Sequence, residues 1–124
     1  MKIATIIARS LLGLLFVVMG LNMFLNFIPL PPPKEELAGD FMKALFASHY
    51  IYVVAILQIA GGLILLTGRY TALGLTLLGP VIVNILCFHL FIDPPGLPLA
   101  GVVAVLALFL LWQNRSAFAG ILRK

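Results

Sequence analysis

Five amide or imidazole side chains lie inside otherwise apolar stretches of the sequence. They are Asn22, Asn26, Gln58, Asn84 and His89. Within a membrane-spanning segment, amide and imidazole groups either join neighbouring helices or line a site for a polar ligand. The same stretches contain no Asp or Glu, the residues that usually relay protons in pumps and ion-coupled transporters. The pattern therefore favours helix contacts or a small ligand pocket over a transporter.

Helical spacing bears on how these side chains are used. Gln58 shares a stripe with Ala55 and Gly62, and such small residues allow a second helix to approach closely. Gln58 is therefore expected to face another helix instead of lipid. Asn84 and His89 are separated by about 140° around one helix. Two alternatives stay open: hydrogen-bonded helix contacts, or one pocket lined by Asn22, Asn26, Gln58, Asn84 and His89.

Other kinds of chemistry have little support. Nucleophilic triads, phosphate-binding loops and zinc-ligand spacings are missing, and Cys87 is the single cysteine, which excludes an intramolecular disulfide or a CxxC redox pair. We expect Cys87 to be a small buried apolar residue. His49 and His89 supply two imidazoles, which hold haem in some helical bundles, but nothing in the sequence shows that they face each other. The sequence thus assigns no catalytic residue, no metal and no certain cofactor.

Four apolar segments must position these side chains. They cover residues 3–28, 50–67, 71–92 and 97–112. A helix needs roughly 20 apolar residues to cross a bilayer core of about 30 Å. Hydrophobic residues make up 63% of the chain and charged residues 10%, whereas a soluble domain has about 25% charged residues. The sequence therefore predicts one all-α domain over residues 1–124, a bundle of four transmembrane helices.

The net charge of +4 is unevenly distributed. Two basic residues, Lys34 and Lys43, fall with all four acidic residues in the first and third connections. The six others flank the opposite ends of the segments: Lys2, Arg9, Arg69, Arg115, Arg123 and Lys124. This asymmetry is typical of a multi-pass protein with both termini in the cytoplasm. We therefore predict a protein of the cell membrane, in a bacterial inner membrane, whose partner is the lipid bilayer and not nucleic acid.

The only long connection joins the first and second apolar segments. Its proline run at residues 29–33 must be extended. Residues 34–47 then have the spacing of a short amphipathic helix. Its apolar half carries Leu37, Ala38, Phe41, Met42, Leu45 and Phe46. Such a helix lies in the membrane interface with its apolar face down, or it covers an opening between the spans.

Several motifs resemble the DoxX family of small four-span membrane proteins. They are Ala8–Phe16, Gly20–Asn22, Ile28–Pro32 and Gly61–Arg69, and most specifically Pro80–Phe91 with Pro94 and Gly96–Leu99. The resemblance implies a four-helix membrane bundle from a family named after subunits linked to quinone-dependent sulfur oxidation. Related proteins of the wider superfamily act as assembly factors for membrane proteins. Many relatives have a Glu where Gln58 stands, and often an acidic residue near Ala107, so this chain departs from a proton-coupled redox pattern.

Two functions follow as expectations. The first is a non-enzymatic subunit or assembly partner of a membrane complex, with another membrane protein as its partner. The alternative is a quinone- or lipid-binding component of a membrane redox system. The two differ in what accompanies the purified protein: a partner protein in the first case, and a quinone, haem or electron-transfer partner in the second.

Overall fold

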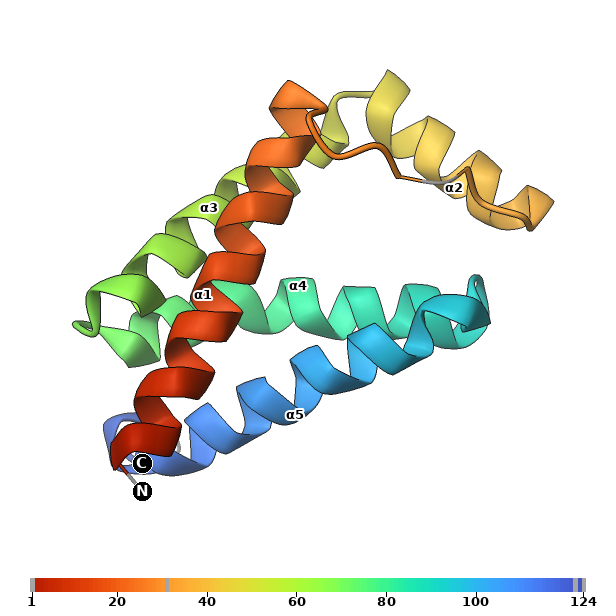
Figure 1. The fold of residues 1–124 in the computed structure, drawn as a ribbon. Coiled ribbons are helices and arrows are strands. Elements are labelled where there is room, and N and C mark those ends of the chain that lie inside the picture. The colour runs from red at the N-terminus through yellow and green to blue at the C-terminus, as the bar shows by residue number, and fades with distance from the viewer. Residues whose placement is uncertain (1, 31, 122, 124) are drawn as a thin grey trace.

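The computed structural model describes residues 2–30, 32–121 and 123, and this part of the chain is helical, as the sequence predicts (Figure 1). Five α-helices follow one another, with two 3-10 turns. They are α1 (Lys2–Leu25), α2 (Glu36–Ala47), α3 (Tyr50–Thr67), α4 (Thr71–Phe91), η1 (Pro94–Gly96), α5 (Leu97–Gln113) and η2 (Arg115–Phe118). Helices α1, α3 and α4, and α5 with its preceding turn, are long and apolar enough to cross a membrane.

The predicted boundaries differ from the observed ones mainly around the proline run. The first segment was expected to reach residue 28, but α1 ends at Leu25 because Asn26 adopts a left-handed φ of 51°. The amphipathic helix begins at Glu36 and not at residue 34. Elsewhere the boundaries agree to within one residue. Helix α3 ends at Thr67 and is capped by Gly68, whose φ of 75° suits a glycine C-cap. Pro31 and Lys124, which entered the predictions, lie outside the described residues.

Small residues bring α1 and α3 together along most of their length. A methyl group added to Gly13 would lie 2.8 Å from the carbonyl oxygen of Gly62, and one added to Gly62 would lie 2.7 Å from that of Gly13. Further along, a methyl group on Gly20 would lie 2.9 Å from the carbonyl oxygen of Ala55. The predicted stripe of Ala55 and Gly62 is therefore the face that α1 contacts.

We call the end of the molecule that carries the two chain termini and the α3–α4 turn the terminal end. Here each of the four long helices contributes to one core (Figure 1). The guanidinium of Arg9 on α1 also donates hydrogen bonds to the carbonyl oxygens of Leu65, at 2.5 Å, and Leu66, at 3.2 Å. Because these carbonyls lie in the last turn of α3, a cation there also complements the helix dipole.

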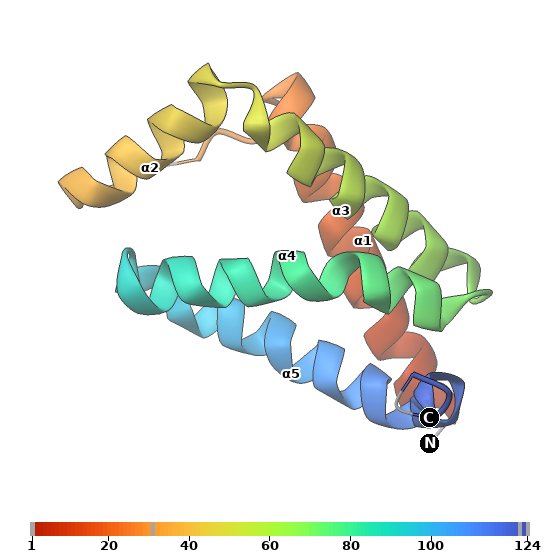
Figure 2. The ribbon, with the colours of Figure 1, turned by 180° about the vertical axis from the view of Figure 1, so that it is seen from behind.

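We call the opposite end, which carries residues 26–49 and 92–96, the α2 end. The α1–α3 pair and the α4–α5 pair diverge toward it (Figures 1 and 2). Residues 26–30 and 32–35 and α2 together form an arm that reaches from α1 toward η1 and returns to α3. The bundle is therefore closed at the terminal end and open at the α2 end.

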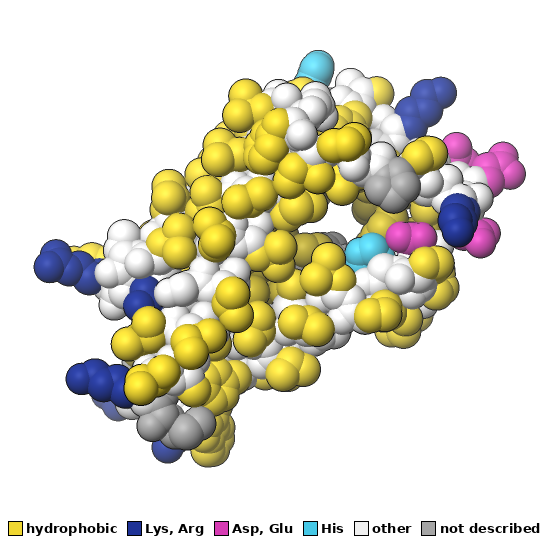
Figure 3. All heavy atoms as spheres, in the orientation of Figure 1, with side chains coloured by type: hydrophobic (Ala, Val, Ile, Leu, Met, Phe, Trp, Pro, Cys, Tyr) yellow, Lys and Arg dark blue, Asp and Glu magenta, His cyan; other side chains and the backbone are white. Residues whose placement is uncertain are grey.

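Charge separates along the same axis. Basic side chains gather at the terminal end, and all the acidic ones lie at the α2 end with two lysines (Figure 3). The described basic residues of the terminal end are Lys2, Arg9, Arg69, Arg115 and Arg123. The fold thus places the two predicted groups of charges at opposite ends of the helices.

Candidate functional site

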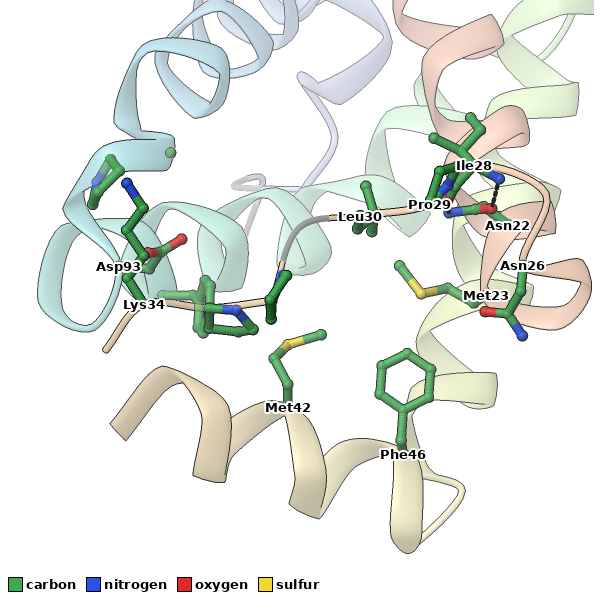
Figure 4. Close-up of a pocket in the computed structure, with 15 residues that line it drawn as sticks. Asn22, Met23, Asn26, Ile28, Pro29, Leu30, Lys34, Met42, Phe46 and Asp93 are labelled. Atoms are coloured by element: carbon green, nitrogen blue, oxygen red, sulfur yellow. Dashed lines mark hydrogen bonds between the residues drawn. The ribbon is translucent and has the colours of Figure 1, made fainter. Parts of the chain in front are cut away.

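A cavity of about 590 Å³ lies at the α2 end, between the arm and the α4–η1 corner (Figures 3 and 4). The end of α1 forms one wall with Asn22, Met23 and Asn26. Met42 and Phe46 of α2 form the cover together with the chain before it, and Phe88 with Asp93, Pro95 and Gly96 forms the opposite wall. Its lining residues Leu30 and Phe46 are exposed, so the space is an open groove and not an enclosed pocket.

Asn22 holds the cover in position. Its side chain is 3% exposed; Oδ1 accepts a hydrogen bond from the backbone N–H of Ile28 at 2.8 Å, and Nδ2 donates one to the Ile28 carbonyl at 3.2 Å (Figure 4). The left-handed turn at Asn26 brings the backbone of Ile28 within hydrogen-bonding distance of the Asn22 side chain. Both polar atoms of Asn22 are therefore used in fixing the chain, while the exposed side chain of Asn26 borders the cavity.

Gln58 lies in the interface of α3 with α1 and does not line the cavity. It is 6% exposed, and a methyl group on Gly20 would lie 3.2 Å from its Cβ. This confirms that Gln58 faces another helix instead of lipid. Its Oε1 is buried without a hydrogen-bond partner among the described residues, so the expected role of Gln58 in joining helices through a hydrogen bond is not seen.

Asn84 and His89 have separate environments on α4. Asn84 is exposed, and its Nδ2 donates to the carbonyl oxygen of Pro80 at 2.7 Å within the same helix. The His89 Nδ1 lies 3.1 Å from the carbonyl oxygen of Asp93 and 3.4 Å from its Oδ2. The ring packs so tightly on Gly96 that a methyl group there would lie 2.2 Å from it.

The expectation that all five residues share one pocket is therefore corrected. Asn22 and Asn26 line the cavity, and His89 supports its rim through Asp93 and Gly96, which both line it. Gln58 and Asn84 lie elsewhere. Helix α3 is rotated so that Gln58 faces α1, and α4 is rotated so that Asn84 faces away from the protein. Cys87, expected to be buried, is exposed on the same helix as Asn84.

Several cavity residues were not identified as site residues from the sequence. They are Lys34, Met42, Phe46, Phe88 and Asp93. For Met42 and Phe46 the signal was the apolar face of the amphipathic helix, and both side chains point from α2 toward the cavity (Figure 4). The rings of Phe41 and Phe88 lie 5.2 Å apart and join α2 to α4. Helix α2 therefore borders the cavity through Met42 and Phe46, and its position relative to the membrane interface stays a prediction.

The two histidines have separate environments. His49 precedes α3 with a left-handed φ of 65° and stacks on Tyr52, with ring centroids 5.7 Å apart. His89 is paired with Asp93 at the α4–η1 corner. Over the described part of the chain, no three His, Cys, Asp or Glu side chains lie together as a metal site would require.

Comparison with known proteins places the chain in a family. It is 31% identical over 117 residues to YwoB of Bacillus subtilis (strain 168), a protein described as uncharacterized, and the match covers 90% of this chain and 73% of YwoB. The chain belongs to the YwoB family. No family model matches it, and no solved structure does. The name YwoB states no activity, so the function of this YwoB-family member must be inferred from its geometry.

Proposed function

We propose that this YwoB-family protein is a non-enzymatic, DoxX-like module of the cell membrane that associates with another membrane-spanning protein through one face of α4. We define the α4 face as the exposed residues of that helix. They are Leu73, Thr76, Pro80, Val83, Asn84, Cys87, Leu90 and Phe91. Most of them repeat at intervals of three and four residues, the spacing at which one helix packs along another.

The single observation that carries the proposal is the exposure of Asn84. The residue lies just past the middle of α4, in a helix long and apolar enough to span a membrane. Among the described residues its one hydrogen bond uses Nδ2, which leaves Oδ1 to find a partner outside the chain. A bare amide in hydrocarbon is costly, and an amide that bonds across a helix contact relieves this cost by roughly 0.6–2 kcal/mol.

The exposed face of α5 shows what a purely lipid-facing stripe contains. Its large exposed residues are all apolar: Leu99, Val102, Val105, Leu108, Leu111 and Trp112. The α4 face instead carries Thr76, Pro80, Asn84 and Cys87 among its aliphatic residues. Because both helices belong to one chain and meet the same membrane, the contrast supports a protein contact at α4.

The charge separation supports a membrane orientation for the module. Positive residues are enriched in the cytoplasmic connections of multi-pass proteins. With five described basic residues and no acidic residue at the terminal end, we place this end and both chain termini in the cytoplasm. The α2 end then faces the opposite side of the membrane.

Cys87 provides a native reporter for this proposal, because it is the only cysteine and lies on the α4 face. A thiol-linked photo-crosslinker at Cys87 should yield a protein adduct in native membranes. Asn84→Leu should reduce the adduct by about 3- to 30-fold, the factor that corresponds to the lost hydrogen bond. Val83→Leu, a change of similar position that removes no polar group, should leave it unchanged.

Crosslinking to lipid alone in the unmodified chain would contradict the proposal. Equal loss of the protein adduct in Asn84→Leu and Val83→Leu would also contradict it, because the amide would then have no special part. Copurification of a quinone, haem or electron-transfer protein would instead support the redox alternative.

A further inference from the structure

We propose that the cavity at the α2 end binds a phospholipid whose headgroup carries both a phosphate and a primary ammonium, as phosphatidylethanolamine does. This site is separate from the α4 face, and the inference does not depend on the function proposed above. It rests on where the cavity lies, on the apolar side chains that enclose it, and on two opposite charges that border it.

The cavity lies at the depth of a lipid headgroup. Its walls are the last residues of α1 and α4, two helices of spanning length that end at Leu25 and Phe91. Polar and charged side chains of the arm begin directly beyond it. A ligand in this position meets hydrocarbon on one side and the membrane surface on the other, so the site suits a molecule that is itself amphiphilic.

The lining matches the apolar part of such a molecule. Met23, Leu30, Met42 and Phe46 face the same space (Figure 4). Phe88 of α4 lines it as well. Methionine is flexible and adapts to irregular apolar shapes, as a lipid site requires. A volume of about 590 Å³ accommodates the glycerol region and the first methylene groups of a lipid, while the remaining acyl chain continues into the bilayer.

Two charges of opposite sign border the same cavity. Lys34 follows the proline run, and Asp93 precedes η1. Among the described residues Lys34 and Asp93 form no ion pair with each other. The Asp93 Oδ2 lies 3.4 Å from the His89 Nδ1, a contact that is an ion pair only when the imidazole is protonated. A lysine ammonium binds phosphate as a point charge, and a carboxylate accepts hydrogen bonds from a primary ammonium.

This charge arrangement selects among headgroups. A choline group has no N–H to donate to Asp93, and an anionic glycerol headgroup offers that carboxylate no cation. Of these three headgroups, only ethanolamine offers both a phosphate for Lys34 and a primary ammonium for Asp93. The contact of the His89 ring with Asp93 and Gly96 fixes the position of the carboxylate, which favours a specific hydrogen bond over diffuse attraction.

The test is native mass spectrometry of the purified full chain. The protein is mixed in turn with phosphatidylethanolamine, phosphatidylcholine and phosphatidylglycerol of identical acyl chains. We expect the ethanolamine lipid to be retained about 10-fold better than either of the others, the factor for one charge-assisted hydrogen bond. Equal retention of all three lipids, or a copurified polypeptide in place of lipid, would overturn the assignment.

Matched substitutions locate the site. Asp93→Asn should abolish the preference for ethanolamine over choline, whereas Asp40→Asn removes the same charge from the part of α2 outside the cavity and should leave it intact. Lys34→Gln should weaken retention of all three phosphate-bearing lipids by about 3-fold, as for an exposed charge pair, and Lys43→Gln should not. If Asp93→Asn fails to fold by circular dichroism, the headgroup preference of the unmodified chain still decides the question.

The outcomes are also distinguishable from those for the α4 face. Substitutions at Lys34 and Asp93 should leave crosslinking through Cys87 unchanged, because neither residue belongs to that face. A site variant that loses lipid retention and crosslinking together would show that the two surfaces are not independent and would contradict their separation.

Discussion

The two ends of the bundle are built from different kinds of contact. At the terminal end, backbones meet at glycines and fully buried leucines fill the space between helices, among them Leu12, Leu65 and Leu110. At the α2 end, only one residue of α2, Ala38, is buried, and the arm is held by single hydrogen bonds and ring contacts. Dense packing stabilises a fold, whereas sites that admit a ligand come from the less stable parts of a structure. The comparison therefore separates the part that holds the fold from the part that can bind.

The largest expected loss of stability comes from a substitution at the α1–α3 contact. In Gly62→Ala the new methyl group would lie 2.7 Å from the Gly13 carbonyl oxygen and 3.0 Å from the backbone nitrogen of Val17. Since backbone cannot move aside without separating the helices, we expect a loss of about 3 kcal/mol in the free energy of unfolding. This loss can be measured by unfolding the protein in mixed micelles and monitoring its helix content by circular dichroism.

A glycine with free space around it provides the control. Gly101 lies within α5, and a methyl group there would meet nothing within 4 Å. Gly101→Ala should therefore be neutral or should stabilise by up to about 1 kcal/mol, because alanine restricts the unfolded chain. Similar losses for both substitutions would show that glycine contacts do not distinguish the terminal end.

The second effect concerns the cation that caps α3. Arg9→Met keeps most of the side-chain stem and removes the hydrogen bonds to Leu65 and Leu66. We expect a loss of about 2 kcal/mol in the free energy of unfolding, the usual value for hydrogen bonds to a charged group. Lys2→Met removes a charge at the same end without such bonds and should cost little. An unchanged stability for Arg9→Met would mean that the cap does not help to close the terminal end.

How far the sequence predicted the molecule differs between the same two ends. Apolar runs ending at Gly68 or before the Asp93–Pro94 turn predicted the spans closely, because a helix in lipid must satisfy its backbone internally. The end of the first span, before the proline run at residues 29–33, was predicted three residues too late. The stripe of Ala55 and Gly62 correctly predicted a close helix contact. These features depend on residues near one another in sequence or on one helix face.

The site could not be predicted in the same way. A helical wheel gives the angle between Asn84 and His89 but not the rotation of α4 relative to α1 and α3, which decides what each residue faces. The role of Asn22 depends on a left-handed turn at Asn26 that returns the chain to it. From the sequence, Lys34 and Asp93 were treated only as charged residues in two separate connections between helices. The arm and the α4–η1 corner bring both residues to one cavity.

The smallest expected effect on stability, and the sharpest test of the comparison, is Asn22→Leu. The substitution removes both hydrogen bonds to the backbone of Ile28, while leucine keeps most of the buried volume. Because Ile28 is exposed and water can replace the lost partner, each bond contributes about 0.5 kcal/mol, so the two together cost about 1 kcal/mol. The change should therefore act locally: amide hydrogen exchange should accelerate in residues 26–35 and in α2, and it should stay unchanged in residues 8–16 of α1. The reason is that Asn22 holds the arm, whereas the core of the terminal end makes no use of it.

Asn26→Leu removes an amide from the neighbouring turn without these bonds, but it places a branched side chain at φ 51°, so Asn26→Gly is the better control and should leave exchange in α2 nearly unchanged. If Asn22→Leu accelerates exchange equally at both ends, the bundle opens as one cooperative unit, and the division between a packed end and a binding end is wrong.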